Sequence, residues 1–149
     1  MQKTLERKLV MPTKLEKEIK KFYEGKNRMI TSLDDYQEQA RKTAIYPDKY
    51  KVTYPALGLA SEAGEVAGKV KKILRDTPKE IKTLGDLDKT NQGEMQLKNL
   101  AAEIGDVLWY CAVLAEDCGI TLSHIANQNI AKLQSRKLRG VLQGSGDSR

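Results

Sequence analysis

The chain has 149 residues and a mass of 16.7 kDa, a size that suits a single domain with its own core. Hydrophobic residues make up 40% of it and charged residues 31%, which excludes a disordered chain and a membrane-spanning one. No apolar run approaches the roughly 20 residues that cross a bilayer. The net charge of +6 needs a closer look, because basic proteins often bind nucleic acids.

The positive charge is concentrated at the two ends of the chain. Residues 1–28 carry +5 and residues 132–149 carry +4, whereas residues 29–131 carry −3. The central part of the chain is therefore mildly acidic. This distribution argues against nucleic acid as the partner.

Cysteine usage and the first residues predict the cellular compartment. The chain starts with M-Q-K-T-L-E-R-K, which lacks the apolar core of a secretory signal. Cys111 and Cys118 are too few for a disulfide framework, and their spacing fits one face of a helix better than a redox or metal pair. We therefore expect a cytoplasmic protein that does not associate with membranes.

Helical periodicity runs through the whole chain, so we predict an all-α protein with a four-helix-bundle-like domain. Residues 1–30 form a basic N-terminal extension, which contains a lysine-rich helical segment from Lys14 to Tyr23. The domain occupies residues 31–149. Its first helix begins at Thr31-Ser32, where hydroxyl groups can cap it, and ends at about Ala44.

Three further helices are expected in the domain. Tyr54-Pro55 precedes the second, Gly119 supplies a C-terminal cap to the third, and Thr121 caps the fourth. A polar stretch over residues 76–97 connects the second helix to the third. The three helices span, in order, about residues 56–75, 96–118 and 121–139.

Two of these helices carry the same short pattern. Residues 59–66 are L-A-S-E-A-G-E-V, and residues 100–107 are L-A-A-E-I-G-D-V. At about 100° per residue, each segment has an apolar stripe and, beside it, two acidic residues on one face. The stripes comprise Leu59, Ala63, Val66 and Val70 in one helix and Leu100, Ile104, Val107 and Cys111 in the other.

If the two stripes pack together, four carboxylates converge at the edge of the core: Glu62, Glu65, Glu103 and Asp106. Such convergence is unfavourable without a counter-charge, because like charges repel and lose hydration. A hard divalent cation supplies that charge, and Mg²⁺ prefers carboxylate oxygens and keeps water for a phosphate to replace. Gly64 and Gly105 recur at equivalent positions, which indicates a close approach by a helix or a ligand, since a mid-helix glycine costs about 1 kcal/mol.

Cationic and amide side chains accompany the acidic residues. Lys69 and Lys72 lie on the same side of their helix as Glu62 and Glu65, so their ammonium groups can meet phosphate oxygens. Polyphosphate binding combines such cations with neutral hydrogen-bonding groups. The fourth helix provides that mixture on one broad face, with Asn129, Lys132 and Arg136.

These motifs resemble those of a known family. The sequences E-A-G-E at Glu62 and Glu65 and E-I-G-D-V-L-W-Y at Glu103 and Asp106 are similar to the E-x-x-E…E-x-x-D signature of MazG-like nucleotide pyrophosphohydrolases. This family belongs to the all-α NTP pyrophosphatase superfamily. The segment S-L-D-D-Y-Q-E-Q-A resembles the first helix of the family, and the segment that begins N-I-A-K resembles its C-terminal part.

The resemblance implies a chemistry and roles for individual residues. The four carboxylates would bind Mg²⁺, with Mn²⁺ as an alternative ion, and a nucleoside triphosphate would be hydrolysed to a monophosphate and pyrophosphate. Glu62 or Glu65 would position or deprotonate the attacking water. Asn129 and Lys132 match the N-x-x-K segment of the family and would contact the substrate. Arg136 is the third such candidate on this helix.

Oligomeric state and two alternative functions complete the expectations. A domain of only four helices leaves the edge that carries the carboxylates open. We expect a second subunit to cover this edge, and therefore a homodimer or homotetramer. One alternative within the same fold is a phosphoribosyl-ATP pyrophosphohydrolase. Another, from a different class, is a non-enzymatic helical protein that binds nucleic acid or regulates a partner through its basic termini.

Overall fold

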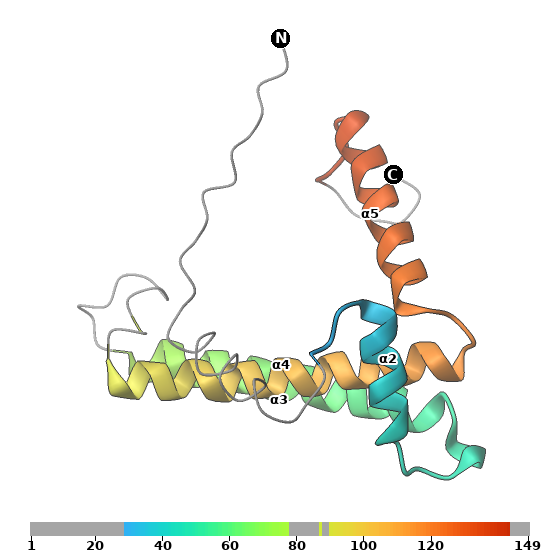
Figure 1. Cartoon of the computed structure of the whole chain (residues 1–149). Coiled ribbons are helices and arrows are strands. Elements are labelled where there is room, and N and C mark those ends of the chain that lie inside the picture. Colours follow the sequence, from blue (N-terminus) through green and yellow to red (C-terminus); the bar gives the residue numbers. More distant parts are fainter. Residues whose placement is uncertain (1–28, 78–86, 88–89, 144–149) are drawn as a thin grey trace. The chain divides into compact units, whose positions relative to one another are not determined.

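The computed structural model describes residues 29–77, 87 and 90–143. The secondary-structure elements of the described residues are all helices, and none is a strand, which confirms the all-α class. The helix expected between Lys14 and Tyr23 and the C-terminal tail from residue 144 lie outside the described residues. The elements are α2 (Leu33–Lys42), the 3₁₀ helix η1 (Asp48–Tyr50), α3 (Thr53–Asp76), α4 (Asn91–Asp117) and α5 (Leu122–Leu138) (Figure 1).

The predicted caps at the helix ends are confirmed. The Ser32 hydroxyl accepts a hydrogen bond from the Asp35 backbone N–H at 3.0 Å at the start of α2. The Thr121 hydroxyl accepts from the His124 N–H at 3.1 Å at the start of α5. After α4, Gly119 adopts a φ of 69°, a left-handed conformation that glycine reaches without steric cost. Local side-chain chemistry therefore decides where these helices begin and end.

Two helix starts differ from the prediction. Helix α3 begins at Thr53, so Pro55 lies in its first turn, where the missing N–H would have had no partner in the helix anyway. Helix α4 begins at Asn91, about one turn before the predicted Gln96, and Thr90 caps it by accepting from the Gly93 N–H at 3.0 Å. The polar composition around Gly93 predicts a loop, but this glycine is helical.

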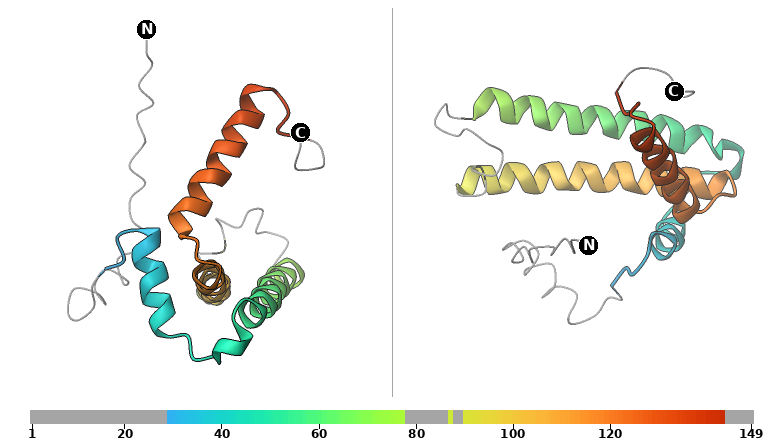
Figure 2. Two further views of the ribbon diagram at one scale, coloured as in Figure 1. Left: turned by 90° about the vertical axis from the view of Figure 1, so that its right-hand side faces the viewer. Right: turned by 90° about the horizontal axis from the view of Figure 1, so that it is seen from above.

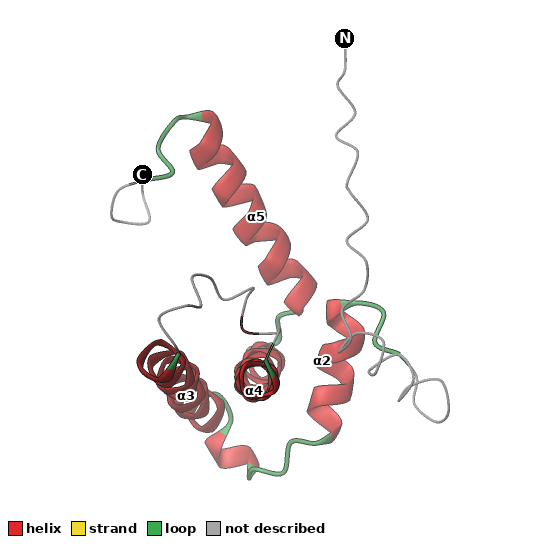
Figure 3. Ribbon diagram, turned by 90° about the vertical axis from the view of Figure 1, so that its left-hand side faces the viewer, coloured by secondary structure: helices red, strands yellow, loops and turns green. Residues whose placement is uncertain are grey.

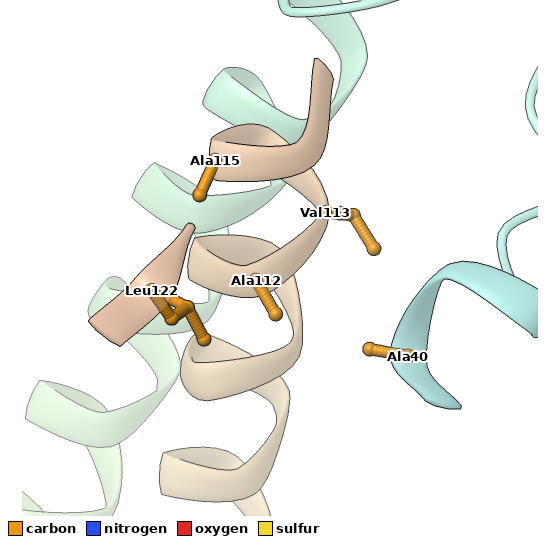
Figure 4. Packing of buried hydrophobic residues seen from close by; sticks show 5 residues of the cluster. All are labelled: Ala40, Ala112, Val113, Ala115 and Leu122. Carbon is orange, nitrogen blue, oxygen red and sulfur yellow. The ribbon is translucent and has the colours of Figure 1, made fainter. Parts of the chain in front are cut away.

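Helices α3 and α4 lie side by side and antiparallel, and α2 packs against α4 near the C-terminal end of α4 (Figures 2 and 3). Helix α5 extends away from the α3–α4 pair and packs against α2. A small apolar cluster joins α2, α4 and the first turn of α5 (Figure 4). Its buried members are Ala40, Ala112, Val113, Ala115 and Leu122. No helix in the described part is both long enough and apolar enough to cross a bilayer.

The close approaches in the fold occur at other glycines than those predicted. A Cβ atom at Gly64 or Gly105 would meet no atom within 4 Å, so no other helix of the described chain crowds these two positions. A Cβ at Gly58 would instead collide with the ring of Tyr110, and one at Gly93 with the backbone of Leu87. The first contact lies in the α3–α4 interface and the second at the start of α4.

The line of contact between α3 and α4 is displaced from the predicted apolar stripes. It runs along Gly58, which receives the Tyr110 ring, and along the acidic residues. Ala63 of the α3 stripe is consequently exposed, and Ile104 of the α4 stripe is 52% exposed. One side of the helix pair therefore remains apolar and open.

The carboxylate of Asp117 fixes the end of the α3–α4 pair. It is 1% exposed and accepts hydrogen bonds from the Tyr46 hydroxyl at 2.7 Å, the Val52 backbone N–H at 2.9 Å and the Arg41 guanidinium at 3.3 Å. Val52 has a φ of 65°, a conformation that is costly for a β-branched residue and needs support from its surroundings. Asp117 at the end of α4 thus holds α2, the loop after α2 and the start of α3.

Replacement of Asp117 by alanine should lower the free energy of unfolding by about 2–3 kcal/mol, because three donors lose a buried charged acceptor. Urea unfolding followed by circular dichroism measures the change. Glu38→Ala is the control, since Glu38 forms only an exposed pair with Lys42, and it should cost less than about 0.5 kcal/mol. Equal losses in the two variants would contradict the role of Asp117.

The Tyr46 hydroxyl makes the free energy of unfolding fall at alkaline pH. Burial, and then the hydrogen bond to Asp117, raise the pKa of Tyr46 from 10.0 to about 12. The folded state therefore holds this proton more tightly than the unfolded state, and the resulting stability is complete below pH 10 and is lost as the pH rises through 12. Tyr46→Phe should cost about 1–2 kcal/mol at pH 8. It should also flatten the fall in unfolding free energy above pH 10, and an unchanged slope would refute this assignment.

Candidate metal centre

Three glutamates from two helices form an acidic cluster. Glu62 and Glu65 lie one turn apart on α3, and the antiparallel packing brings Glu103 of α4 next to them. One carboxylate oxygen from each of the three lies within 4.8 Å of the others. Two oxygens that bind one Mg²⁺ at about 2.1 Å lie at most about 4.2 Å apart, so small side-chain movements would bring the three oxygens onto a single ion. The predicted convergence of these three side chains is confirmed.

Asp106 acts on the same cluster through its charge. The pKa of Glu62 is raised, first by partial loss of hydration and then by the negative charges of Glu65, Asp106 and Glu103. Asp106 also raises the pKa of Tyr36 on α2, where burial is the larger cause. The charge of the fourth predicted carboxylate therefore acts both on the cluster and on Tyr36 of α2.

The two predicted lysines of α3 have different surroundings. Lys69 forms an ion pair with Glu103, with 3.0 Å between Nζ and Oε1. The structure thus brings this cation into the acidic cluster. Lys72 is exposed one turn further along α3, where its charge helps to lower the pKa of Asp76, after the larger effect of the Arg75 hydrogen bond.

The predicted substrate-binding residues lie along α5, a helix that contributes no residue to the acidic cluster. Asn129 and Lys132 are exposed and line a cavity of about 430 Å³ together with Ile125 and Gln128. Arg136 is 5% exposed, so the fold covers its side chain. The structure places the three residues on one helix but does not pack that helix along α3.

An aromatic cavity is the feature that sequence analysis missed. It has a volume of about 360 Å³, and its lining comes from the segment between α2 and η1 and from η1, α3 and α4. Tyr46 and Tyr54 stack there with ring centroids 5.0 Å apart, and the Trp109 indole N–H donates to the Thr43 hydroxyl at 2.7 Å. The signal in the sequence was the group of tyrosines and prolines at residues 46–55. The lining residues are Thr43, Ile45, Tyr46, Pro47, Tyr50, Tyr54 and Trp109.

This aromatic cavity adjoins the acidic cluster. Tyr54 lies against Tyr110, with ring centroids 6.3 Å apart. The pKa of Tyr110 is raised by burial and by Tyr54, and also by the charges of Glu62 and Asp106. One tyrosine pair therefore extends from the aromatic cavity to the neighbourhood of Glu62 and Asp106.

Comparison with known proteins identifies the fold family. Residues 53–140, which contain all the site residues predicted from the sequence, match the model of the MazG nucleotide pyrophosphohydrolase domain. The chain belongs to the MazG family. It is also similar to the Gene 37 protein of Mycobacterium phage L5, with 46% identity over 123 residues that span 78% of this chain and 98% of the phage protein. No solved structure matches the chain.

The MazG cluster has the donor set of a divalent-cation site. Its three glutamate oxygens are hard ligands. Among the described residues, the ion pair that neutralises charge in the cluster is the one between Lys69 and Glu103, while the charges of Glu65, Asp106 and Glu103 raise the pKa of Glu62. Hard divalent ions prefer such oxygen ligands. Glu62, Glu65 and Glu103 would hold the ion, and the charge of Asp106, which raises the pKa of Glu62, adds to the negative potential at the site.

The cluster should couple stability to divalent cations. Glu62→Gln removes one of four converging charges, so without added metal the variant should be as stable as the wild type or slightly more stable. At a hundredfold excess over Kd, Mg²⁺ or Mn²⁺ should stabilise the wild type by about 2–3 kcal/mol. The variant should respond much less. Thermal unfolding with and without the ion measures both effects, and an equal response of the two proteins would rule out this cluster as the site.

Proposed function

We propose that this MazG protein hydrolyses a nucleoside triphosphate, either an NTP or a dNTP, to a nucleoside monophosphate and pyrophosphate in a Mg²⁺-dependent reaction. Water adds across the α–β phosphoanhydride: its oxygen forms a new bond to phosphorus, the bridging oxygen leaves with the other product, and a proton is released. The observation that carries the proposal is the convergence of three glutamate oxygens within 4.8 Å on paired helices.

Each group of residues has a role in this reaction. The carboxylates of Glu62, Glu65, Glu103 and Asp106 hold the cation, which when bound neutralises phosphate charge and makes the water easier to deprotonate. Glu62 or Glu65 also orients the attacking water and accepts its proton. Lys69 can exchange its ion pair with Glu103 for a phosphate oxygen, because its side chain is 31% exposed.

Further cations complete the recognition of the triphosphate. Lys72 of α3 is exposed on the same helix as Lys69 and would contact the phosphates from the far end of the site. From α5, the Asn129 amide and the Lys132 ammonium would bind phosphate oxygens, and Arg136 would add charge once the α5 segment meets the substrate.

The aromatic cavity supports a nucleotide rather than a simple polyphosphate as substrate. Nucleobases stack on aromatic rings, and each such contact is worth about 1–3 kcal/mol. Tyr50 and Tyr54 are exposed at the cavity, so their rings are available to a base. The cavity adjoins the carboxylates through Tyr110, an arrangement in which base and phosphates can be bound together.

A panel of NTPs and dNTPs, with phosphoribosyl-ATP included, should show Mg²⁺-dependent release of pyrophosphate by the wild type. Glu62→Gln and Glu103→Gln should each lower kcat/KM by about a hundredfold or more, because each removes charge that organises the transition state. A coupled pyrophosphate assay measures the rates. Release of orthophosphate instead of pyrophosphate, or full activity in both variants, would refute the proposal.

The matched control is Glu94→Gln. Glu94 belongs to the same helix as Glu103 but pairs with Lys98 in the first turn of α4. This variant should retain wild-type activity and stability. A preference for phosphoribosyl-ATP over every triphosphate would assign the chain to the alternative substrate class.

A further inference from the structure

The segment between α2 and α3 forms most of the aromatic cavity. Residues 43–52 connect the two helices (Figure 1) and supply five of the seven side chains that line the cavity. Several side chains of this segment face solvent: Ile45 is 96% exposed and Tyr50 is 46% exposed. Exposed side chains contribute little apolar burial, so the position of the segment depends on specific polar contacts.

One carboxylate holds two points of this segment. Asp117 Oδ2 accepts a hydrogen bond from the Tyr46 hydroxyl at 2.7 Å and another from the Val52 backbone N–H at 2.9 Å. Asp117 Oδ1 accepts from the Arg41 guanidinium of α2 at 3.3 Å. The carboxylate is 1% exposed, so these hydrogen bonds lie out of water, where the loss of a charged acceptor is costly. Asp117 therefore closes residues 46–52 into a loop of fixed position.

Tyr46 transmits this fixed position to the wall of the cavity. Its hydroxyl donates to Asp117 and accepts from Arg41 Nη1 at 3.2 Å. Its ring lines the cavity and stacks on Tyr54, with centroids 5.0 Å apart and an interplanar angle of 23°. The hydrogen bonds at one end and the stacking on the face fix both the place and the rotation of this ring.

Other parts of the site are held without Asp117. The Trp109 indole N–H donates to the Thr43 hydroxyl at 2.7 Å, and this hydroxyl donates to the Ala40 carbonyl at 2.8 Å. The Tyr110 ring fills the space beside Gly58 between α3 and α4. A change at Asp117 should therefore affect the wall formed by residues 46–52 more than the Trp109 wall or the acidic cluster.

We propose that Asp117 is a positioning residue for nucleotide binding: through Tyr46 and Val52 it holds residues 46–52 so that the aromatic cavity is preorganised to stack a nucleobase. Because Asp117 is buried, it acts through these residues and does not touch the ligand. A wall that is already ordered lowers the entropic cost of binding. The inference rests on the proposed function, which makes a nucleotide the ligand of this cavity.

Trp109 provides a direct measurement of cavity occupancy. It is the one tryptophan of the chain and lines the cavity, so a base that stacks there should change its fluorescence. The probes are the α,β-methylene analogues of ATP and dTTP, in which the bond to be hydrolysed is replaced. These analogues should quench Trp109 in the presence of Mg²⁺, whereas inorganic pyrophosphate, which has no base, should not. Calorimetry gives the Kd of each probe.

Two variants weaken the support of the cavity wall and leave its rings in place. In Asp117→Asn the charge is lost and one oxygen becomes an NH₂ donor, so the Kd of the methylene analogues should rise about tenfold. Tyr46→Phe retains the ring but not its hydrogen bonds, and the Kd should rise about threefold. The Kd of pyrophosphate should stay within about twofold of the wild-type value in both variants.

The matched control is Asp48→Asn. Asp48 lies in the same segment, but its carboxylate is exposed and pairs with Lys51 at 3.1 Å, so this variant should bind every probe as the wild type does. Circular dichroism checks that each variant is folded. If Asp117→Asn does not fold, Tyr46→Phe decides the test.

The outcomes separate this inference from the proposed function. A loss confined to the nucleotide analogues supports the positioning role of Asp117. No loss in the folded variants, an equal loss for pyrophosphate, or no quenching of Trp109 by either analogue would overturn it, even if the wild type releases pyrophosphate. A selective loss in a protein that releases no pyrophosphate would support the positioning role and refute the proposed reaction.

Discussion

The register between α3 and α4 is the constraint on which the site depends. Two separate contacts set it: Asp117 holds the Val52 N–H at one end of the pair, and the Tyr110 ring fills the space left by Gly58 nearby. A shift of one residue would turn Glu103 by about 100° away from Glu62. The repulsion among the carboxylates is therefore balanced by packing and hydrogen bonds at some distance from them, which is how a preorganised but electrostatically costly site is maintained.

The sequence could predict those features that depend on neighbouring residues. The caps at Ser32 and Thr121 and the stop at Gly119 are local, so their chemistry is visible in a few letters. The pairing of Glu62 with Glu65 on one face follows from helical periodicity alone. The repeat of this pattern at Glu103 predicted that the carboxylates converge, although the helices meet along a line displaced from the apolar stripes on which the prediction was based.

Features that depend on residues distant in sequence were not predictable in the same way. In the sequence, nothing distinguishes Asp117 from other acidic residues near helix ends. Its role depends on the contact with Tyr46, which is 71 positions away in the chain. Glycine marks a close approach only when the approaching group is known, so the role of Gly58 was not predictable. At Gly64 and Gly105 no helix of the described chain approaches, and the predicted alternative, a ligand, stays a prediction. The aromatic cavity likewise gathers side chains from three helices and the segment that follows α2.

The central apolar cluster of the fold is built largely from small side chains. The buried apolar residues of the described chain are mostly small, with three alanines among the five members of the central cluster. The hydrophobic contribution to stability follows the apolar area removed from water, about 25 cal/mol per Å², so alanines contribute little. Meanwhile Leu74, Ile104 and Leu133 remain at least partly exposed. A surface that covered these side chains would contribute apolar burial that the small central cluster lacks.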